Sequence, residues 1–491
     1  MNQGDFVMRQ GEPADAFYLV YQGALHAASD GRDLADISGG QVVGEMAYFD
    51  VEKRRNATVR VASKTATVIK VPYATLDVIF AKRPLLRELF RHLQGPRQLV
   101  RKQLLEVGEK GLGATDSREF GRQITQWVNE LLKIVSQVLA EERGYDLNHF
   151  AVATYGSLAR GEELVYASDV DFRVIPQAAK FSEHARYLDE AIHDVLTRVL
   201  GNFSISGLEV DQILKKDYPH LFYMSPDDLK SERGKDLWGP TRDQYIPAID
   251  SVATGLPNEI LPTTLRDMNF VAGNKTVFDA FSEIAREKLY DQAARPMFEK
   301  AFLGRLDEMA TQMRGLSGQQ DFVRRFNIKE HGARAIQYFV WRERSRFSGD
   351  PELRDAQSPF EFIDKLSAEG KLSAEDAAKL NAAFSTILRL RNILHLISID
   401  EGRPDAHILT LGVQNFAKAA QRSGMSEAEF ERTIREQMAS LYQVLGGYFG
   451  IADFNEAAKN LTTGAPASPA GARLALQQQK QKLEDMALAK E

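Results

Sequence analysis

The first eighty residues alternate apolar and polar positions in short runs that glycines interrupt. The stretches AFYLVYQGALHAAS, DLADISGGQVVGE and NATVRVASKTATVIKVP have a period of two, which is typical of half-buried β-strands. We therefore predict an all-β barrel or roll over residues 1–83. From residue 84 the apolar spacing becomes helical, with an expected break at Gly95 and Pro96. Residues 84–145 are predicted to be connector helices.

The remainder of the chain is predicted to hold an α/β domain, residues 146–257, and then an all-α region, residues 258–455. The expected elements of the α/β domain are strand 149–155, strand 169–175, helix 182–200 and strand 205–214. Residues 456–491 have the composition of a flexible linker followed by a polar tail helix. An apolar stripe at helical spacing is predicted to be core: Phe339, Trp341, Leu388, Leu390, Ile393 and Leu396. The predicted fold class is therefore multidomain.

Two aspartates stand on one predicted strand within YGSLARGEELVYASDVDF, residues 155–172. Because side chains alternate along a strand, Asp169 and Asp171 would point to the same face, roughly 7 Å apart. Two carboxylates in an apolar strand repel each other unless a cation lies between them. Mg²⁺ or Mn²⁺ suits such a pair, since both ions prefer oxygen ligands and Mg²⁺ also binds substrate phosphates.

The turn before these aspartates supplies groups that could bind phosphate. Gly156 and Ser157 would present backbone N–H groups and a hydroxyl to phosphate oxygens, and Arg160 extends the loop. Together with the carboxylates, this arrangement predicts metal-dependent phosphoryl or nucleotidyl transfer. The alternatives are a tight turn with two surface aspartates and an inactive copy of such a site. Arg160 could equally form a surface ion pair.

The Gly-Ser and Ser-Asp-x-Asp pattern resembles the nucleotidyltransferases of the DNA polymerase β superfamily. Within it, YGSLARGEELVYASDVDFRVI is similar to the PII uridylyltransferase and glutamine-synthetase adenylyltransferase group. The stretches FVAGNKTVFDAF, RRFNIKEHGARAIQYFVWRERSRF and LRLRNILHL follow the order of that group's helical partner region. The resemblance covers about residues 145–420. It implies transfer of AMP or UMP from a nucleoside triphosphate to an acceptor, which in this group is a protein.

The resemblance also implies a third carboxylate in LEVDQIL, residues 208–214. Asp211 is the expected residue, and Glu209 is the rival on the same face. By this resemblance Asp169, Asp171 and Asp211 would bind the metal, and Asp211 would also activate the acceptor hydroxyl.

Two further groups of residues in the helical region carry weaker expectations. Lys329 and Arg334 stand near a predicted helix start, from which they could reach the triphosphate; the alternative is a solvated helix face. The run from Arg389 to His395 resembles the Arg-x-x-x-x-x-His pattern of small helical ribonucleases. Its helical period and apolar neighbours favour an interior helix with an ordinary histidine.

The stretch GEMAYFDVEKRRNATVRV, residues 44–61, holds groups that suit a cyclic nucleotide. An arginine can bind the phosphate bidentately and a glutamate can accept a ribose hydroxyl. This stretch looks like the phosphate-binding cassette of cyclic-nucleotide-binding domains, and GDFVMRQGEPADAFYLVYQGAL matches the strands before it. Family members usually begin with helices, whereas here the roll begins almost at Met1. By this resemblance the residues that bind cAMP or cGMP are Gly44, Glu45, Arg55, Asn56 and Thr58. The alternative is a roll that has lost its ligand.

Composition and charge narrow the classes of function. The 491 residues include no cysteine, so disulfides, zinc–thiolate sites and cysteine nucleophiles are excluded. The net charge of −6 argues against general nucleic-acid binding, and no apolar run is long enough for a membrane span. We expect a cytoplasmic protein, and a homodimer only by analogy with capping helices that pair.

We therefore predict a cyclic-nucleotide-regulated nucleotidyltransferase. One alternative is a catalytically inactive, cyclic-nucleotide-responsive scaffold or partner regulator. Another is an enzyme that makes a small nucleotide or modifies an RNA end.

Overall fold

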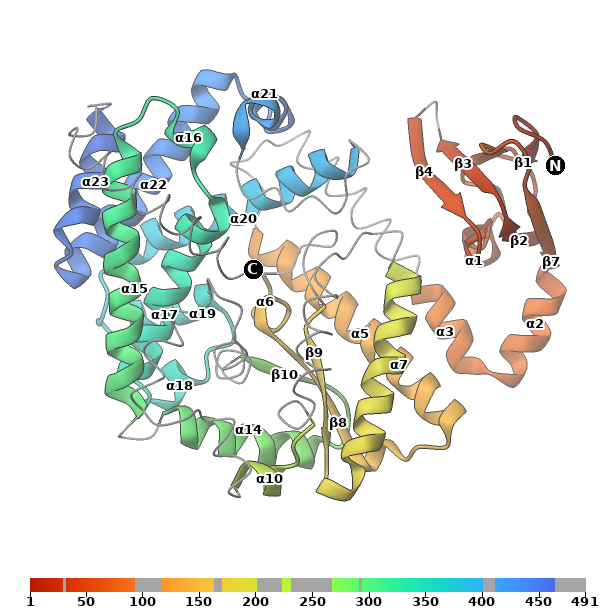
Figure 1. Ribbon diagram of the computed structural model, residues 1–491, viewed down its shortest axis with the longest axis horizontal. Helices are drawn as coiled ribbons and strands as arrows, with labels where there is room; N and C mark the ends of the chain where they lie inside the picture. The colour runs from red at the N-terminus through yellow and green to blue at the C-terminus, as the bar shows by residue number, and fades with distance from the viewer. Residues whose placement is uncertain are drawn as a thin grey trace, which may run out of the picture. The chain divides into compact units, whose positions relative to one another are not determined.

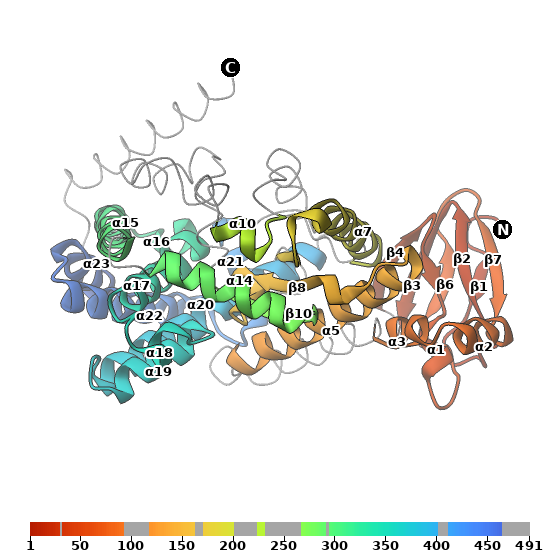
Figure 2. The ribbon, with the colours of Figure 1, turned by 90° about the horizontal axis from the view of Figure 1, so that it is seen from below.

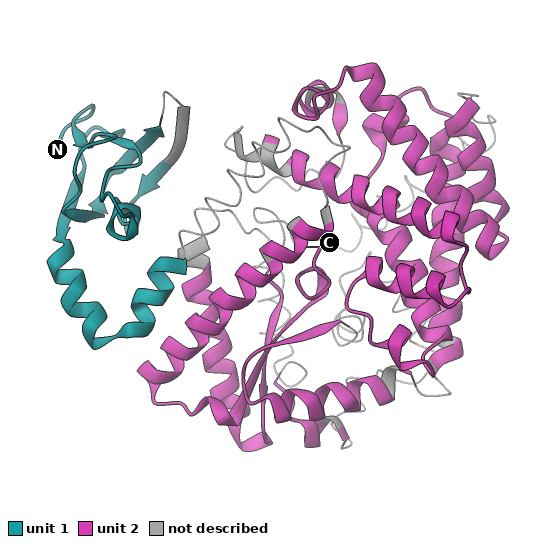
Figure 3. Cartoon of the chain, turned by 180° about the vertical axis from the view of Figure 1, so that it is seen from behind, with its two compact units in different colours: residues 1–98 teal, residues 99–491 magenta. Residues whose placement is uncertain are grey.

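The structure is a computed structural model of the chain. It describes residues 1–29, 32–92, 117–162, 170–200, 223–230, 267–290, 294–400 and 411–463. The chain divides into two compact units, residues 1–98 and 99–491 (Figure 3). Each unit is described by itself below.

The first unit is a β-roll closed by helices. Its strands are β1 (Phe6–Met8), β2 (Ala16–Gln22), β3 (Ala24–Ser29), β4 (Arg32–Ser38), β5 (Val42–Val43), β6 (Thr58–Val61) and β7 (Thr67–Pro72). They form two antiparallel sheets, in the orders β1-β6-β3-β4 and β5-β2-β7. Val20, Leu25 and Val59 are fully buried in the core of the roll. The predicted all-β roll is confirmed.

The prediction differs from the structure at the end of the roll. Tyr73–Lys82 forms helix α2, not a further strand, and α3 (Pro84–His92) follows it. The buried residues of α2 are Tyr73, Leu76 and Phe80, spaced by three and four, which is the period of a helix. A short helix, α1 (Met46–Phe49), interrupts the strands. The expected break at Gly95 and Pro96 lies outside the described residues.

The α/β part of the second unit contains a described three-stranded antiparallel sheet in the order β10-β8-β9 (Figure 1). Its strands are β8 (Phe150–Tyr155), β9 (Phe172–Pro176) and β10 (Met268–Gly273). The helices α5 (Ser117–Arg143), α7 (Ser182–Leu200) and α14 (Lys275–Leu289) contact it. Shorter helices are η1 (Leu147–His149), α6 (Gly156–Ala159), η2 (Ala179–Phe181) and α10 (Pro226–Lys230).

The predicted strand 149–155 and helix 182–200 agree with β8 and α7. The predicted strand 169–175 does not: β9 begins at Phe172, and all five of its residues are buried. A strand buried on both faces has no period of two, so its start could not be set by alternation. Asp171 therefore precedes the strand. Asp169 and the predicted strand 205–214 lie outside the described residues.

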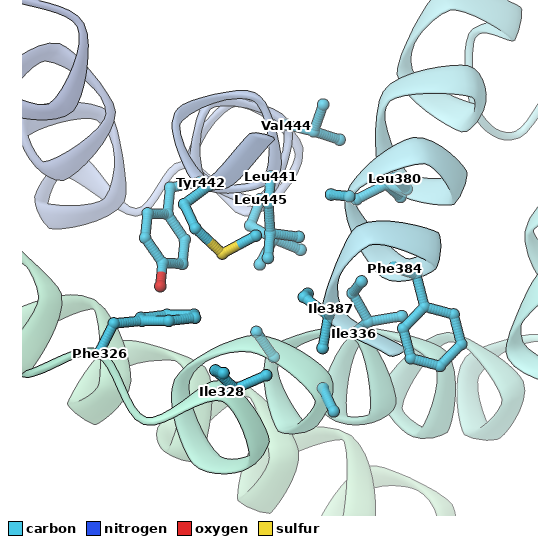
Figure 4. Packing of buried hydrophobic residues seen from close by; sticks show 14 of the residues in the cluster. Phe326, Ile328, Ile336, Leu380, Phe384, Ile387, Leu441, Tyr442, Val444 and Leu445 are labelled. Atoms are coloured by element: carbon cyan, nitrogen blue, oxygen red, sulfur yellow. The ribbon is translucent and has the colours of Figure 1, made fainter. Parts of the chain in front are cut away.

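The rest of the second unit is a helical bundle, whose helices α15, α17, α22 and α23 lie together in Figure 2. Its elements are α15 (Ala294–Ser317), α16 (Phe322–Arg325), the π-helix η5 (Ile328–Ala333), α17 (Arg334–Arg346), α18 (Pro351–Arg354), α19 (Pro359–Ala368), α20 (Ala374–Asp400), α21 (Gly412–Arg422), α22 (Glu427–Phe449) and α23 (Ala452–Thr463). Figure 4 shows the packing between η5, α17, α20 and α22, where Ile336, Ile387 and Leu445 are fully buried.

The predicted core stripe is confirmed at Phe339, Trp341, Leu388, Leu390 and Ile393, all of them buried. The side chain of Leu396 is not among those described. Helix α23 continues to Thr463, so residues 456–463 are helical and not the predicted linker; residues 464–491 lie outside the described part. Across the described residues, no helix combines the length and the apolarity that a membrane span requires.

Candidate functional site

Two of the predicted transferase residues meet at the end of strand β8. Gly156 follows the strand directly, with a φ of 65°, and the Tyr155 N–H donates to the Asp171 carbonyl at 3.1 Å. The Asp171 carboxylate lies over the α-carbon of Gly156, where an added Cβ would be 2.5 Å from its Oδ2 atom. Both the backbone conformation and this contact require glycine. The structure thus brings Gly156 and Asp171 together, and their roles in phosphate and metal binding stay predictions.

The loop after Gly156 is compact because its own backbone groups are paired. Residues 156–159 form the single turn of helix α6, and the N–H groups of Arg160 and Glu162 donate to the carbonyls of Gly156 and Ser157. Ser157 itself is half-buried. We call residues 156–162 the nucleotide loop, after the role predicted for it.

Helix α5 and strand β10 hold the nucleotide loop from two sides. The Thr125 hydroxyl on α5 donates to the Leu158 carbonyl at 3.0 Å. The side-chain amide of Asn269, the second residue of β10, donates to the Ala159 carbonyl at 2.7 Å. At Gly121, α5 comes so close to the Gly161 carbonyl that a Cβ on Gly121 would overlap it. The loop geometry therefore depends on backbone contacts with α5.

The structure gives Arg160 a different role from the predicted phosphate contact. Its guanidinium is buried and donates to both carboxylate oxygens of Glu162, at 2.9 and 3.0 Å, and to Asp267 at 3.1 Å. The ring of Trp341 lies beside it, 5.8 Å from its Cζ atom. Nor is this the surface ion pair considered as the alternative, because both carboxylates are also buried. The physical reason is pairing: a buried guanidinium needs carboxylate partners, and Arg160 has two.

The electrostatics of this cluster favour its ionised form. Burial alone would raise the pKa of Asp267, but Arg344 and Arg160 outweigh it and hold that pKa below its usual value. Burial likewise opposes the charge on Arg160, and Glu162 and Asp267 overcome it, so its pKa is raised. Asp267 and Arg160 therefore both stay charged in the interior.

Lys329 and Arg334 lie at the junction between η5 and α17. Lys329 is half-buried on the π-helix, and Arg334 begins α17, where it donates to the Gln337 side chain at 3.0 Å. A contact of either residue with a triphosphate stays a prediction. The side chain of His395 is not described.

A divalent metal would have Asp171 as its only described ligand among the three predicted carboxylates. Asp169, Asp211 and the rival Glu209 lie outside the described residues. In the part of the chain that the structure does describe, no three His, Asp or Glu side chains gather as a metal site would require. Asp171 fits a metal role in one respect: its carboxylate lies at the nucleotide loop, and oxygen ligands suit Mg²⁺ and Mn²⁺.

In the first unit, the predicted cassette centres on the carbonyl of Gly44. Arg55 is buried and donates to this carbonyl at 3.3 Å and to that of Ala16 at 2.7 Å; the Tyr73 hydroxyl also donates to Gly44, at 2.7 Å. Arg55 lies 3.9 Å from the Asp15 carboxylate. A Cβ on Gly44, whose φ is 87°, would be 2.6 Å from Arg55 Nη1. The structure therefore brings Gly44 and Arg55 together.

The other predicted cassette residues surround this pair. Glu45 is half-buried at the N-cap of α1. Asn56 is exposed, and Thr58 begins β6, where its hydroxyl accepts the Gln10 N–H at 3.0 Å. Their contacts with a cyclic nucleotide stay predictions.

Sequence reasoning did not identify Glu162, Asp267, Gln337 or Tyr73 as parts of these sites. Glu162 could have been noticed, since it stands two residues after Arg160. The partners of the loop at Asp267 and Gln337 lie far away along the chain, and no local pattern marks them.

Comparison with known families identifies two segments of the chain. Residues 1–83 match the family described as "Cyclic nucleotide-binding domain", and residues 303–420 match the family described as "Putative nucleotidyltransferase substrate binding domain". The chain thus joins these two kinds of domain, which is the fusion that the resemblance predicted. The three predicted carboxylates lie between the two matched segments. No curated protein matches the chain.

Several solved structures share limited similarity with it. One is the N-terminal domain of a transcriptional regulator from Streptomyces coelicolor A3(2), at 26% identity and a TM-score of 0.17, covering 20% of this chain and 74% of that one. The EAL enzyme Bd1971 matches in its cGMP-bound form (14% identity) and its cAMP-bound form (13% identity). Both matches have a TM-score of 0.18 and cover 47% of this chain and 53% of the other. With TM-scores this low, they carry no argument about this chain.

Proposed function

We propose that this chain is a cyclic-nucleotide-regulated nucleotidyltransferase, which moves AMP or UMP from a nucleoside triphosphate to an acceptor. By the resemblance, the acceptor is a protein. The observation that carries the proposal is the pair formed by Gly156 and Asp171, which joins a glycine loop to a carboxylate between the two matched segments. This juxtaposition is what triphosphate transfer requires, since phosphates and a metal ligand must meet there.

In this proposal the chain's own residues bind and orient the substrates. The nucleotide loop contributes its backbone and the Ser157 hydroxyl to the triphosphate, and Asp171 receives the metal together with Asp169 and Asp211. The metal, Mg²⁺ or Mn²⁺, would neutralise phosphate charge when bound. Asp211 would accept the proton of the acceptor hydroxyl. The helical segment that matches the substrate-binding family would receive the acceptor.

Regulation would pass from the roll to the nucleotide loop through helix α5. This is the first described helix after the residues of the first unit, and it contacts the loop at Gly121 and Thr125. A small displacement of α5 would move the Leu158 and Gly161 carbonyls with it, because Gly121 leaves no space between the two backbones. In the roll, Arg55 and Glu45 would bind the phosphate and the ribose of cAMP or cGMP.

The first experiment is calorimetry of the full chain with cAMP and cGMP, followed by ATP and UTP with Mg²⁺. Binding of a cyclic nucleotide together with metal-dependent binding of a triphosphate would support the proposal. Cyclic-nucleotide binding without any triphosphate binding would instead favour an inactive scaffold. Triphosphate binding alone would leave the enzyme but make the roll a structural or protein-contact domain.

A substitution at the predicted carboxylates tests the catalytic part. Asp171→Asn and Asp169→Asn should abolish transfer from a labelled triphosphate while the unfolding temperature stays near that of the wild type. Full transfer activity in either variant would contradict the proposed metal site.

A further inference from the structure

A buried cluster of charges links the nucleotide loop to the helical bundle. Glu162 accepts three hydrogen bonds, two from Arg160 and one from the Gln337 amide at 2.8 Å. Asp267 accepts from Arg160 and from Arg344, and Arg344 also donates to the Ala356 carbonyl at 2.7 Å. Gln337 and Arg344 both belong to helix α17.

The cluster is balanced in charge and closed to water. It contains two arginines and two carboxylates, and none of these four residues is more than 8% exposed. Gln337, the neutral member, is 4% exposed. Desolvated charges are tolerated only with well-placed partners, so each member restricts the position of the others. Replacing any one of them leaves a buried charge or acceptor short of a partner.

This cluster restrains the nucleotide loop at its far end. Gly156 begins the loop against Asp171, whereas Arg160 and Glu162 end it inside the cluster. Helix α17 therefore determines where the end of the loop lies. Since α17 falls within the segment that matches the substrate-binding family, that segment helps to complete the nucleotide site.

We propose that Gln337 and Arg344 are positioning residues of the nucleotide site, which act through Glu162 and Asp267 to hold the loop in the geometry that triphosphate binding needs. The inference rests on the proposed function for its nucleotide. Its structural part, that α17 holds the loop, can be tested without any nucleotide.

The test compares Gln337→Met with Tyr448→Phe in the full chain. Gln337→Met removes one neutral donor from the buried carboxylate of Glu162 and also removes the acceptor of the Arg334 guanidinium. Tyr448→Phe removes one neutral donor, at 2.9 Å, from the buried carboxylate of Glu343, which is also on α17. Each variant thus takes one neutral donor from a buried carboxylate, but in only one of them does that carboxylate belong to the nucleotide loop.

Three measurements are made on each variant: the unfolding temperature, amide hydrogen exchange over residues 156–162, and calorimetric affinity for ATP and UTP with Mg²⁺. We expect both variants to lose unfolding temperature, Gln337→Met somewhat more because it also loses its hydrogen bond with Arg334. Only in Gln337→Met should the backbone amides of Arg160 and Glu162 exchange faster. Only this variant should bind the triphosphate about tenfold more weakly. If Gln337→Met does not fold, Gln337→Asn is used, which keeps the amide but is too short to reach Glu162.

Equal exchange over residues 156–162 in the two variants would overturn the inference, as would unchanged triphosphate affinity in Gln337→Met. A wild-type chain that binds no nucleoside triphosphate would refute the proposed function. In that case the exchange comparison alone decides whether α17 holds the loop, so the two failures are distinguishable.

Discussion

The carboxylate of Asp171 occupies the space that a side chain on Gly156 would need, with its Oδ2 atom 2.5 Å from the position of a Cβ. The two residues are fifteen positions apart, and the backbone hydrogen bond between Tyr155 and Asp171 brings them together. Position 156 therefore requires glycine for a steric reason as well as a conformational one.

Gly156→Ala should disrupt the nucleotide loop. The left-handed backbone costs about 1–2 kcal/mol for alanine, and displacing Asp171 adds about 1–3 kcal/mol. Gly144→Ala is the matched control, because Gly144 has a φ of 68° and nothing within 4 Å of its Cβ position. Both variants should lose stability in thermal unfolding, but only Gly156→Ala should lose metal-dependent triphosphate binding. Equal triphosphate affinity in the two variants would show that the Asp171 contact has no role in binding.

Gly44→Ala should impair cyclic-nucleotide binding, because the added methyl group would push against the Arg55 guanidinium and the methyl group of Met8. We expect an affinity loss of about tenfold or more, as displaced binding groups typically produce. Gly40→Ala is the control, since Gly40 has a φ of 88°, close to the 87° of Gly44, and open space around its Cβ position. Calorimetry with cAMP and with cGMP compares the two. An affinity equal to that of Gly40→Ala would remove Arg55 from the proposed ligand site.

Gly121→Ala tests the contact between helix α5 and the nucleotide loop. In an exposed helix, alanine in place of glycine normally stabilises by about 0.5–1 kcal/mol, and Gly304→Ala on α15 should do so, because Gly304 has open space around it. Gly121→Ala should instead destabilise by about 1–3 kcal/mol, since the methyl group meets the Gly161 backbone. Denaturant unfolding measures both. A stabilised Gly121→Ala variant would mean that α5 and the loop are not in contact.

The raised pKa of Tyr73 predicts a loss of stability in alkaline solution. Burial raises the pKa of Tyr73 to about 12, above the ordinary value of 10 for tyrosine. The pKa of Tyr73 is higher in the folded state than in the unfolded chain. The stability that protonated Tyr73 contributes is therefore fully present below pH 10 and is lost as the pH rises toward 12. Tyr73→Phe should lack this part of the decline. At neutral pH its free energy of unfolding should be lower by about 1 kcal/mol, because it lacks the hydrogen bond to the Gly44 carbonyl. Unfolding curves of both proteins between pH 7 and 12 should show that the difference between their free energies of unfolding narrows as the pH rises. Parallel declines of the two proteins would contradict this prediction.

Local pattern was enough to predict the parts of the molecule whose partners are near in sequence. The period of two predicted the roll strands, and the helical period predicted α7 and the buried Phe339 and Trp341. Helix α2 was missed because its apolar residues continue directly from an alternating strand.

The role of Arg160 could not be predicted in this way. Its sequence neighbourhood, a polar loop after a glycine turn, suggests an exposed cation. What makes it a buried residue is Asp267, which reaches it across 107 positions of sequence, and Trp341, whose ring covers it. Burial of this kind depends on tertiary contacts, which the spacing of residues within one segment does not specify.

The charge cluster also determines the order in which the second unit can mature during synthesis. Its hydrogen bonds join positions separated by 107, 77 and 175 residues, so none of these long-range links can form until the later partner has left the ribosome. Strand β8 and the nucleotide loop are synthesised long before α17. Until α17 follows, Glu162 lacks its Gln337 donor and Asp267 lacks its Arg344 partner, so a nascent or truncated chain that ends before residue 337 would carry the loop without the restraint that α17 supplies.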